Sequence, residues 1–364
     1  MRVLPDRQIG QWTPAALLCT LVLFSCAWAA RAEAKPPYAP PADKIWHGVS
    51  DTGRVPDFKR FNDQVRSHNA LNIVFYHWGV PLSNALERWK KMDARGVLSL
   101  STAPGGQPEV ISPRGISRGR DDEYPLRLWR AIRNSNQVVY VRPFGEMNLH
   151  YNPYSAFNAD GSRRAGHSTH AFKLAWKRIA LILRGGRRAA LNKKLRDLGM
   201  PRMLRANRND SPVYDRHDVP KVLDPTKVAF VWTPLTRGSP NVPGNTPGAY
   251  FPGRKYVDWV GTDVYSKFSN QTLWTNLNSF FDRYNGFPFM LAEYGAWDND
   301  HDGSFTRRIH RWARGHRRVR ALLYYRSVNT ENVFNLQYYD GARHSLRKIL
   351  NRNRYAPFAP NTKD

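Results

Sequence analysis

Eight short apolar runs recur along this chain, and they constrain its fold more than any other feature. They cover residues 45–49, 71–78, 97–101, 138–143, 228–233, 256–265, 287–293 and 322–327. Segments with the apolar spacing of helices lie between most of these runs. Alternating strands and helices favour parallel pairing through right-handed crossovers, and eight such repeats can close on themselves. The pattern therefore predicts a (β/α)8 TIM barrel.

The helices that we expect are residues 56–67, 83–94, 124–132, 170–183, 273–284, 305–315 and 341–349. Residues 184–227 are rich in Arg, Asn, Asp and Pro, so we interpret them as an irregular insertion after the fourth helix rather than a second domain. Residues 237–252 form a polar, proline-rich loop on the barrel face where ligands bind. A chain of 364 residues therefore suits a single barrel domain, 45–355, with loop insertions and a short tail, 356–364.

The first 34 residues have the organisation of a secretory signal peptide. Arg2 and Arg7 precede an apolar stretch, 15–30, and Ala32–Ala34 provides a cleavage site of the A-x-A type, with 27–29 as a competitor. A secreted protein cleaved near Ala34 is our interpretation. Lipid attachment at Cys26 is the alternative, although Phe24 is bulky for a lipoprotein signal. The apolar stretch falls short of the ~20 residues that span a bilayer.

Both cysteines, Cys19 and Cys26, lie inside this N-terminal segment. Cleavage would leave a mature chain without thiols or disulfides, beginning with a proline-rich lead, 35–44. We expect no transmembrane segment in that mature chain, and we expect a monomer.

The formal net charge is +27, and basic residues concentrate in runs such as 184–188 and 307–320. Such a charge could attract nucleic acid or an acidic polymer. No nucleic-acid motif accompanies it, and the arginines fall on outer helices of the expected barrel. A solvated basic face is therefore our interpretation, with no nucleic-acid partner.

Two glutamates each follow an apolar strand. Glu146 comes after the run 138–143, and Glu293 ends the run 287–293. The carboxyl ends of parallel barrel strands meet at one face, where such proteins hold their chemistry. Glycoside hydrolysis needs a pair of carboxyl groups, one as acid and one as base or nucleophile. The spacing favours that reaction.

Three segments carry a family resemblance: RPFGEMN, FPGRKYVDWVGTDVY and PFMLAEYG. They resemble, in order and spacing, the signature segments of glycoside hydrolase family 26, the β-mannanase family of retaining (β/α)8 glycosidases. The resemblance extends from about Trp46 to Leu350. It implies that Glu146 is the general acid/base and Glu293 the nucleophile. It also implies that Tyr265 hydrogen-bonds the nucleophile while Asp263 supports the site. Retention predicts carboxyl groups about 5–5.5 Å apart.

Further substrate-binding candidates flank these segments. Arg142 could hold Glu293 ionised, or it could form a core ion pair instead. His77, Trp78 and Trp232 end strands and could line a sugar pocket, although packing roles are the alternative for each. We expect no metal site and no cofactor, because the acidic loop WDNDHDG lacks the spacing and distal glutamate of a calcium loop.

The chain departs from the family pattern around the expected site. Gly145 replaces the usual histidine before the acid/base, Tyr151 stands where a tryptophan is usual, and the aromatic residue of the last strand falls at Tyr324 or Tyr325.

The expected function is a secreted retaining endo-β-glycanase acting on a polysaccharide, foremost an endo-β-1,4-mannanase. The alternatives are a β-1,3-1,4-glucanase, a β-1,3-xylanase, and a non-catalytic glycan-binding protein on the same fold. Whether cleavage is internal or terminal stays open at this point.

Overall fold

The computed structural model describes residues 38–203, 219–327 and 333–360. The signal-peptide prediction and both cysteines lie outside these residues. From residue 36 onward the chain forms one compact unit. Within the described residues, no helix combines the length and apolar character that a bilayer span requires.

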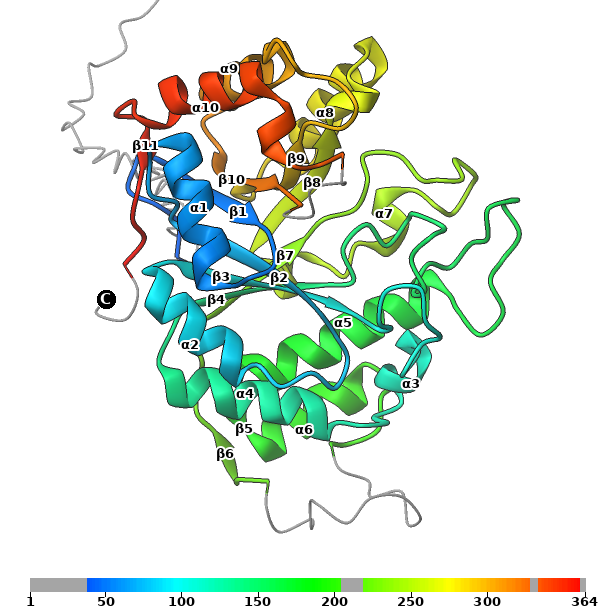
Figure 1. Cartoon of the computed structure of the whole chain (residues 1–364). Helices are drawn as coiled ribbons and strands as arrows, with labels where there is room; N and C mark the ends of the chain where they lie inside the picture. Colours follow the sequence, from blue (N-terminus) through cyan, green and yellow to red (C-terminus); the bar gives the residue numbers. More distant parts are fainter. Residues whose placement is uncertain (1–37, 204–218, 328–332, 361–364) are drawn as a thin grey trace, which may run out of the picture. The chain divides into compact units, whose positions relative to one another are not determined.

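Eight parallel strands close into a barrel, which confirms the predicted fold (Figure 1). Each predicted run contains or overlaps one of them. The strands are β1 (Ile45–Ser50), β2 (Leu71–His77), β3 (Arg95–Ser101), β4 (Val139–Pro143), β7 (Val228–Trp232), β8 (Trp259–Tyr265), β9 (Phe289–Gly295) and β10 (Val319–Tyr325). Pairing of β10 with β1 closes the ring, and β11 (Tyr355–Ala356) adds to the start of β1.

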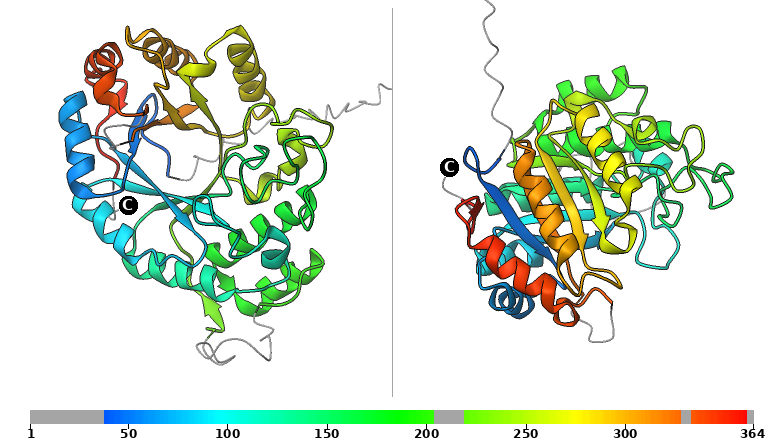
Figure 2. Two further views of the ribbon diagram at one scale, coloured as in Figure 1. Left: turned by 45° about the vertical axis from the view of Figure 1, so that its right-hand side comes forward. Right: turned by 90° about the horizontal axis from the view of Figure 1, so that it is seen from above.

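Helices surround the barrel and follow one another around it in sequence order (Figure 2). The seven that were predicted are α1 (Val55–Val65), α2 (Ser83–Met92), α4 (Glu123–Ser135), α5 (Thr169–Arg184), α8 (Gln271–Arg283), α9 (Ser304–Gly315) and α10 (Asp340–Leu350). The connection from β7 to β8 has the short α7 (Pro247–Tyr250) and a 3-10 turn, η1 (Arg254–Tyr256), in place of a full helix, in keeping with the predicted proline-rich loop. A second short helix, α3 (Pro113–Ser117), precedes α4.

The long connection after α5 is more regular than its composition predicts. It holds α6 (Arg188–Asp197) and an antiparallel pair, β5 (Gly186–Arg187) with β6 (Val222–Leu223). Leu191 and Leu195, four residues apart, are both buried. The prediction of a wholly irregular insertion was therefore wrong. Two leucines were too weak a periodic signal among so many charged residues, although they suffice to hold one helix against its neighbours.

Strand alternation sorts side chains between two cores. Val139 and Val141 of β4 pack outward in the cluster between strands and helices, whereas Tyr140 packs in the barrel interior with Trp259 and Met290. Arg142, two residues after Tyr140, points to the same inner side. The interior is thus apolar low in the barrel and charged where the strands end.

Candidate active site

A cavity of about 250 Å³ opens where several barrel strands end. Its lining comes from β2, β3, β4, β9, β10 and the loop after β4, and it includes both Glu146 and Glu293. The two glutamates are 147 positions apart in the sequence, yet they share one cavity. Their predicted convergence at the barrel mouth is what the structure shows.

Arg142 connects the charged groups below this cavity. Its guanidinium is buried, and it donates from Nη1 to Glu293 Oε1 at 2.5 Å and from Nη2 to Asp263 Oδ2. Nε donates to Thr233 Oγ1 at 2.6 Å. Burial alone would lower the pKa of Arg142, but the carboxylates of Asp263 and Glu293 raise it instead. Arg142 therefore stays charged, and its buried position gives it a fixed orientation.

Glu293 accepts hydrogen bonds on both carboxylate oxygens. Arg142 contacts Oε1, and the Tyr265 hydroxyl donates to Oε2 at 2.6 Å. Burial and the charge of Glu293 raise the pKa of Tyr265 well above its usual value, so Tyr265 remains a donor. The i, i+2 spacing of Asp263 and Tyr265 places both beside Glu293, as expected for one face of a strand.

A register shift in β9 aims Glu293 at the cavity. The paired residues of β9 pass from Leu291 to Glu293 on the β8 side and from Leu291 to Tyr294 on the β10 side. In each case β9 has one residue more than the neighbouring strand over the same stretch. Met290 and Ala292 face the barrel interior. Strict alternation from them would turn Glu293 outward, whereas a bulge re-aims the side chain that follows it. The irregularity thus positions the carboxylate.

Glu146 sits on a sharp turn after β4. Phe144 and Glu146 have left-handed backbones, with φ of 56° and 51°. Such conformations cost about 1–3 kcal/mol each in a residue with a side chain, and tertiary contacts must hold them. The Glu146 N–H donates to Thr233 O at 2.7 Å, and its carbonyl accepts from Asn152 Nδ2 at 2.9 Å. This strained turn presents the Glu146 carboxyl group to the cavity.

The electrostatics favour a proton on Glu146. Burial, with help from the negative charge of Glu293, raises the pKa of Glu146 to about 7, and Arg142 only partly opposes this. The cluster holds one guanidinium against three carboxyl groups, so full ionisation would leave a net negative site. The Oδ1 atom of Asp263 is buried and has no hydrogen-bond partner among the described residues. Burial, opposed by Arg142, raises the pKa of Asp263 as well.

Several site residues escaped the sequence analysis. Ser99 and Thr233 accept hydrogen bonds from Arg142. Ser99 is a polar residue inside an apolar run and Thr233 ends another, and this position is the one feature of the sequence that could have marked them as site residues. The Tyr154 hydroxyl donates to Gly145 O at 2.6 Å, and nothing in the sequence pointed to it. Phe75, also unforeseen, forms an aromatic wall of the cavity with Tyr325, and the two ring centroids lie 6.0 Å apart. Tyr325 is one of the two residues at which the aromatic position of the last strand was expected.

Of the seven predicted substrate-binding residues, Arg142 alone belongs to the cavity lining. Asp263 and Tyr265 contact Arg142 and Glu293 from behind it, and the other four lie farther from the two glutamates. Trp232 is fully buried among aromatic rings of the core, and Trp78 is 2% exposed with its indole N–H donating to Asp121. His77 is half-buried against the carbonyl of Trp78, and Tyr151 is 81% exposed in the loop after β4. The burial of both rings favours the packing role, which was the alternative for Trp78 and Trp232.

Replacing Trp232 by alanine is expected to destabilise the fold and leave the chemistry intact. Trp232 is 0% exposed and packs against Phe251 and Tyr284 at ring-centroid distances of 5.0 Å each. Removing a buried tryptophan typically costs about 3–5 kcal/mol. Urea unfolding measures the loss, and hydrolysis by the folded fraction at low temperature should retain the wild-type KM. A KM raised severalfold at unchanged stability would instead indicate a sugar contact.

Gly145 is explained by its contact with Arg142. A Cβ atom at this position would lie 2.5 Å from Arg142 Cζ and 2.6 Å from Nη2. The guanidinium has no room to withdraw without breaking its bonds to Glu293 and Asp263. Gly145, at the position where the family pattern has a histidine, therefore leaves room for the Arg142 guanidinium.

Restoring the histidine of the family pattern, Gly145→His, is expected to lower kcat rather than raise it. The new side chain must displace the guanidinium that holds Glu293, so we expect a loss of roughly 10²-fold, as for a misplaced catalytic group. Hydrolysis rates with matched Gly145→Ala and Gly145→His variants measure the effect. Activity at or above wild type in both would show that Arg142 tolerates a side chain there.

Comparisons with known proteins agree on the fold. No family model matches the chain, and no curated protein matches it. The solved structure of GH26A from a Muricauda species matches 86% of this chain and 91% of its own at 14% identity, with a TM-score of 0.50. The YdhT protein of Bacillus subtilis matches 87% of each chain at 13% identity, with a TM-score of 0.52. The GH26 β-mannanase BoMan26A of Bacteroides ovatus matches 87% of this chain and 91% of its own, at 13% identity and a TM-score of 0.50. At such identities the likeness establishes the shared barrel fold.

Proposed function

We propose that this chain is a secreted retaining β-glycan hydrolase that cleaves β-1,4-mannan internally. The observation that carries the proposal is one cavity holding two glutamates with different surroundings. Arg142 and Tyr265 fix Glu293 through both of its oxygens, and the pKa of Glu146 is raised to about 7. Two carboxyl groups in unequal environments are what an acid and a nucleophile require.

In the proposed mechanism Glu146 protonates the leaving glycosidic oxygen while Glu293 attacks the anomeric carbon. The covalent glycosyl-enzyme then reacts with water, which loses its proton to Glu146. Phe75, 47% exposed, and Tyr325 are placed to stack on a sugar ring, in the role first expected of the tryptophans. The similarity to BoMan26A, a β-mannanase of Bacteroides ovatus, supports the choice of a β-mannan substrate.

The test is a panel of polysaccharides treated with purified mature protein. We expect new reducing ends from β-1,4-mannan, a rapid fall in viscosity from internal cleavage, and β-anomers as the first products seen by NMR. Cleavage of mixed-linkage glucan or β-1,3-xylan alone would keep the mechanism and change the substrate. First products of α configuration would exclude retention.

A non-catalytic glycan-binding protein is the second candidate, because Gly145 lines the cavity of the two glutamates at the position where the family pattern has a histidine. It predicts measurable mannan binding with no covalent labelling of Glu293 by a 2-fluoroglycoside. Labelling of Glu293 would exclude it.

Secretion is part of the proposal and makes its own prediction. Protein exported by an expression host should begin at Lys35, immediately after the A-x-A motif that ends at Ala34. N-terminal sequencing of the exported protein checks this. Lipid attached at Cys26, detected by mass spectrometry, would replace cleavage at Ala34 with the lipoprotein alternative.

A further inference from the structure

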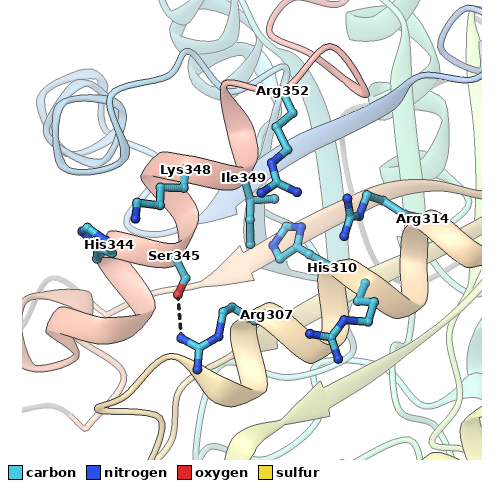
Figure 3. Close-up of a pocket in the computed structure, with 9 residues that line it drawn as sticks. Arg307, His310, Arg314, His344, Ser345, Lys348, Ile349 and Arg352 are labelled. Atoms are coloured by element: carbon cyan, nitrogen blue, oxygen red, sulfur yellow. Dashed lines mark hydrogen bonds between the residues drawn. The ribbon is translucent and has the colours of Figure 1, made fainter.

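A second cavity, of about 270 Å³, lies between helices α9 and α10 (Figure 3). None of its lining residues belongs to the cavity that holds Glu146 and Glu293. The α9 side comes from the basic run 307–320, which the proposed hydrolase mechanism does not use.

Cations form the walls of this cavity. Arg307, Arg311 and Arg314 lie at i, i+4 and i+7 on α9, which places them on one helix face. Lys348 of α10 and Arg352 in the turn after it face them from the other side (Figure 3). The lining contains no aspartate and no glutamate. Five positive side chains therefore surround one cavity with no acid among them.

Four of these five charges have no ion-pair partner within the described part of the chain. Arg307 is the exception, because it lies 3.8 Å from a carboxylate oxygen of Asp302 and also donates hydrogen bonds to Asp302 O and Ser345 Oγ. Arg311, Arg314, Lys348 and Arg352 form no ion pair with any described residue. Like charges four residues apart on a helix repel one another. A bound anion would relieve that repulsion.

The floor of the cavity is buried and preformed. His310 is 1% exposed, and each of its ring nitrogens contacts a hydroxyl, Nδ1 with Tyr355 and Nε2 with Tyr294 at 2.8 Å. Burial, with smaller contributions from His47 and Arg314, lowers the pKa of His310 well below its usual value. The floor is therefore a neutral surface, and the positive charge belongs to the arginines and the lysine around it.

We propose that this cavity binds the phosphate or sulfate group of a small anionic ligand. Guanidinium groups present paired N–H donors that match the oxygens of a tetrahedral oxyanion, and they remain charged at every physiological pH. The proposal does not depend on the hydrolase activity.

Isothermal titration of the full chain tests the proposal with four probes: inorganic phosphate, inorganic sulfate, glucose 6-phosphate and glucose. We expect saturable binding of the first three, weakened by added NaCl, and none of glucose. The double variant Arg314→Gln/Arg352→Gln should bind at least tenfold more weakly. Arg317→Gln removes one charge from the same basic run outside the cavity, and it should stay within twofold of wild type.

The probes also separate the oxyanion from the rest of the ligand. Tighter binding of glucose 6-phosphate than of phosphate supports a sugar phosphate, whereas equal binding supports recognition of the oxyanion alone. Saturable binding of none of the anions overturns the proposal, and so does an equal loss in Arg317→Gln. A second double variant, Arg311→Gln/Lys348→Gln, should reproduce the tenfold loss, and unchanged circular dichroism verifies that each variant is folded.

Discussion

Glu293→Gln is expected to abolish hydrolysis, with kcat lowered by roughly 10⁴-fold or more. Glutamine keeps the size of the side chain and can still accept from Tyr265, but it cannot form the glycosyl ester. It also removes the negative charge that Arg142 contacts at 2.5 Å. Release of reducing ends from the accepted polysaccharide, measured over hours, provides the necessary range.

The matched control for this variant is Glu87→Gln, which makes the same change at an exposed position on α2. It should keep wild-type activity. A 2-fluoroglycoside should label wild type and the control at Glu293, and should leave Glu293→Gln unlabelled. Wild-type turnover by Glu293→Gln would mean that the glycosyl-enzyme forms on another residue or not at all.

Glu146→Ala is expected to slow polysaccharide hydrolysis by roughly 10²–10⁴-fold, the usual contribution of general acid catalysis. The loss should be much smaller for aryl glycosides with good leaving groups, since those need little protonation. Comparing the two substrate types isolates the acid step. An equal loss on both would indicate that Glu146 supports the site without donating a proton.

The pH profile makes a linked expectation. Burial raises the pKa of Glu146 to about 7, so its acid form predominates below that pH and is lost above it. Wild-type kcat/KM on polysaccharide should therefore fall as the pH rises through about 7. The fall should disappear in Glu146→Ala, whose residual rate has no such acid to lose. A wild-type rate that increases from pH 7 to 9 would contradict the assignment.

The sequence by itself determined the barrel and pointed to the two glutamates that share the cavity. Each of the eight apolar runs contains or overlaps a barrel strand, because burial between the interior and the helices requires such runs whatever the partners. It also placed Asp263 and Tyr265 on one face, since alternation along a strand is a local property. Glu146 and Glu293 could be recognised at strand ends because the apolar runs before them are local features of the sequence as well.

Tertiary structure decided how those groups are aimed. The shifted pairing at Ala292 turns Glu293 inward, and the contact of Gly145 with Arg142 leaves no space for a Cβ. Packing around Trp78 and Trp232 keeps both rings out of the cavity that holds Glu146 and Glu293. Each depends on segments far apart in the chain that meet only after folding. Local sequence determines the alternation of side chains along a strand. The position of a bulge, the close approach of two residues and the burial of a ring are determined by the segments that pack against them.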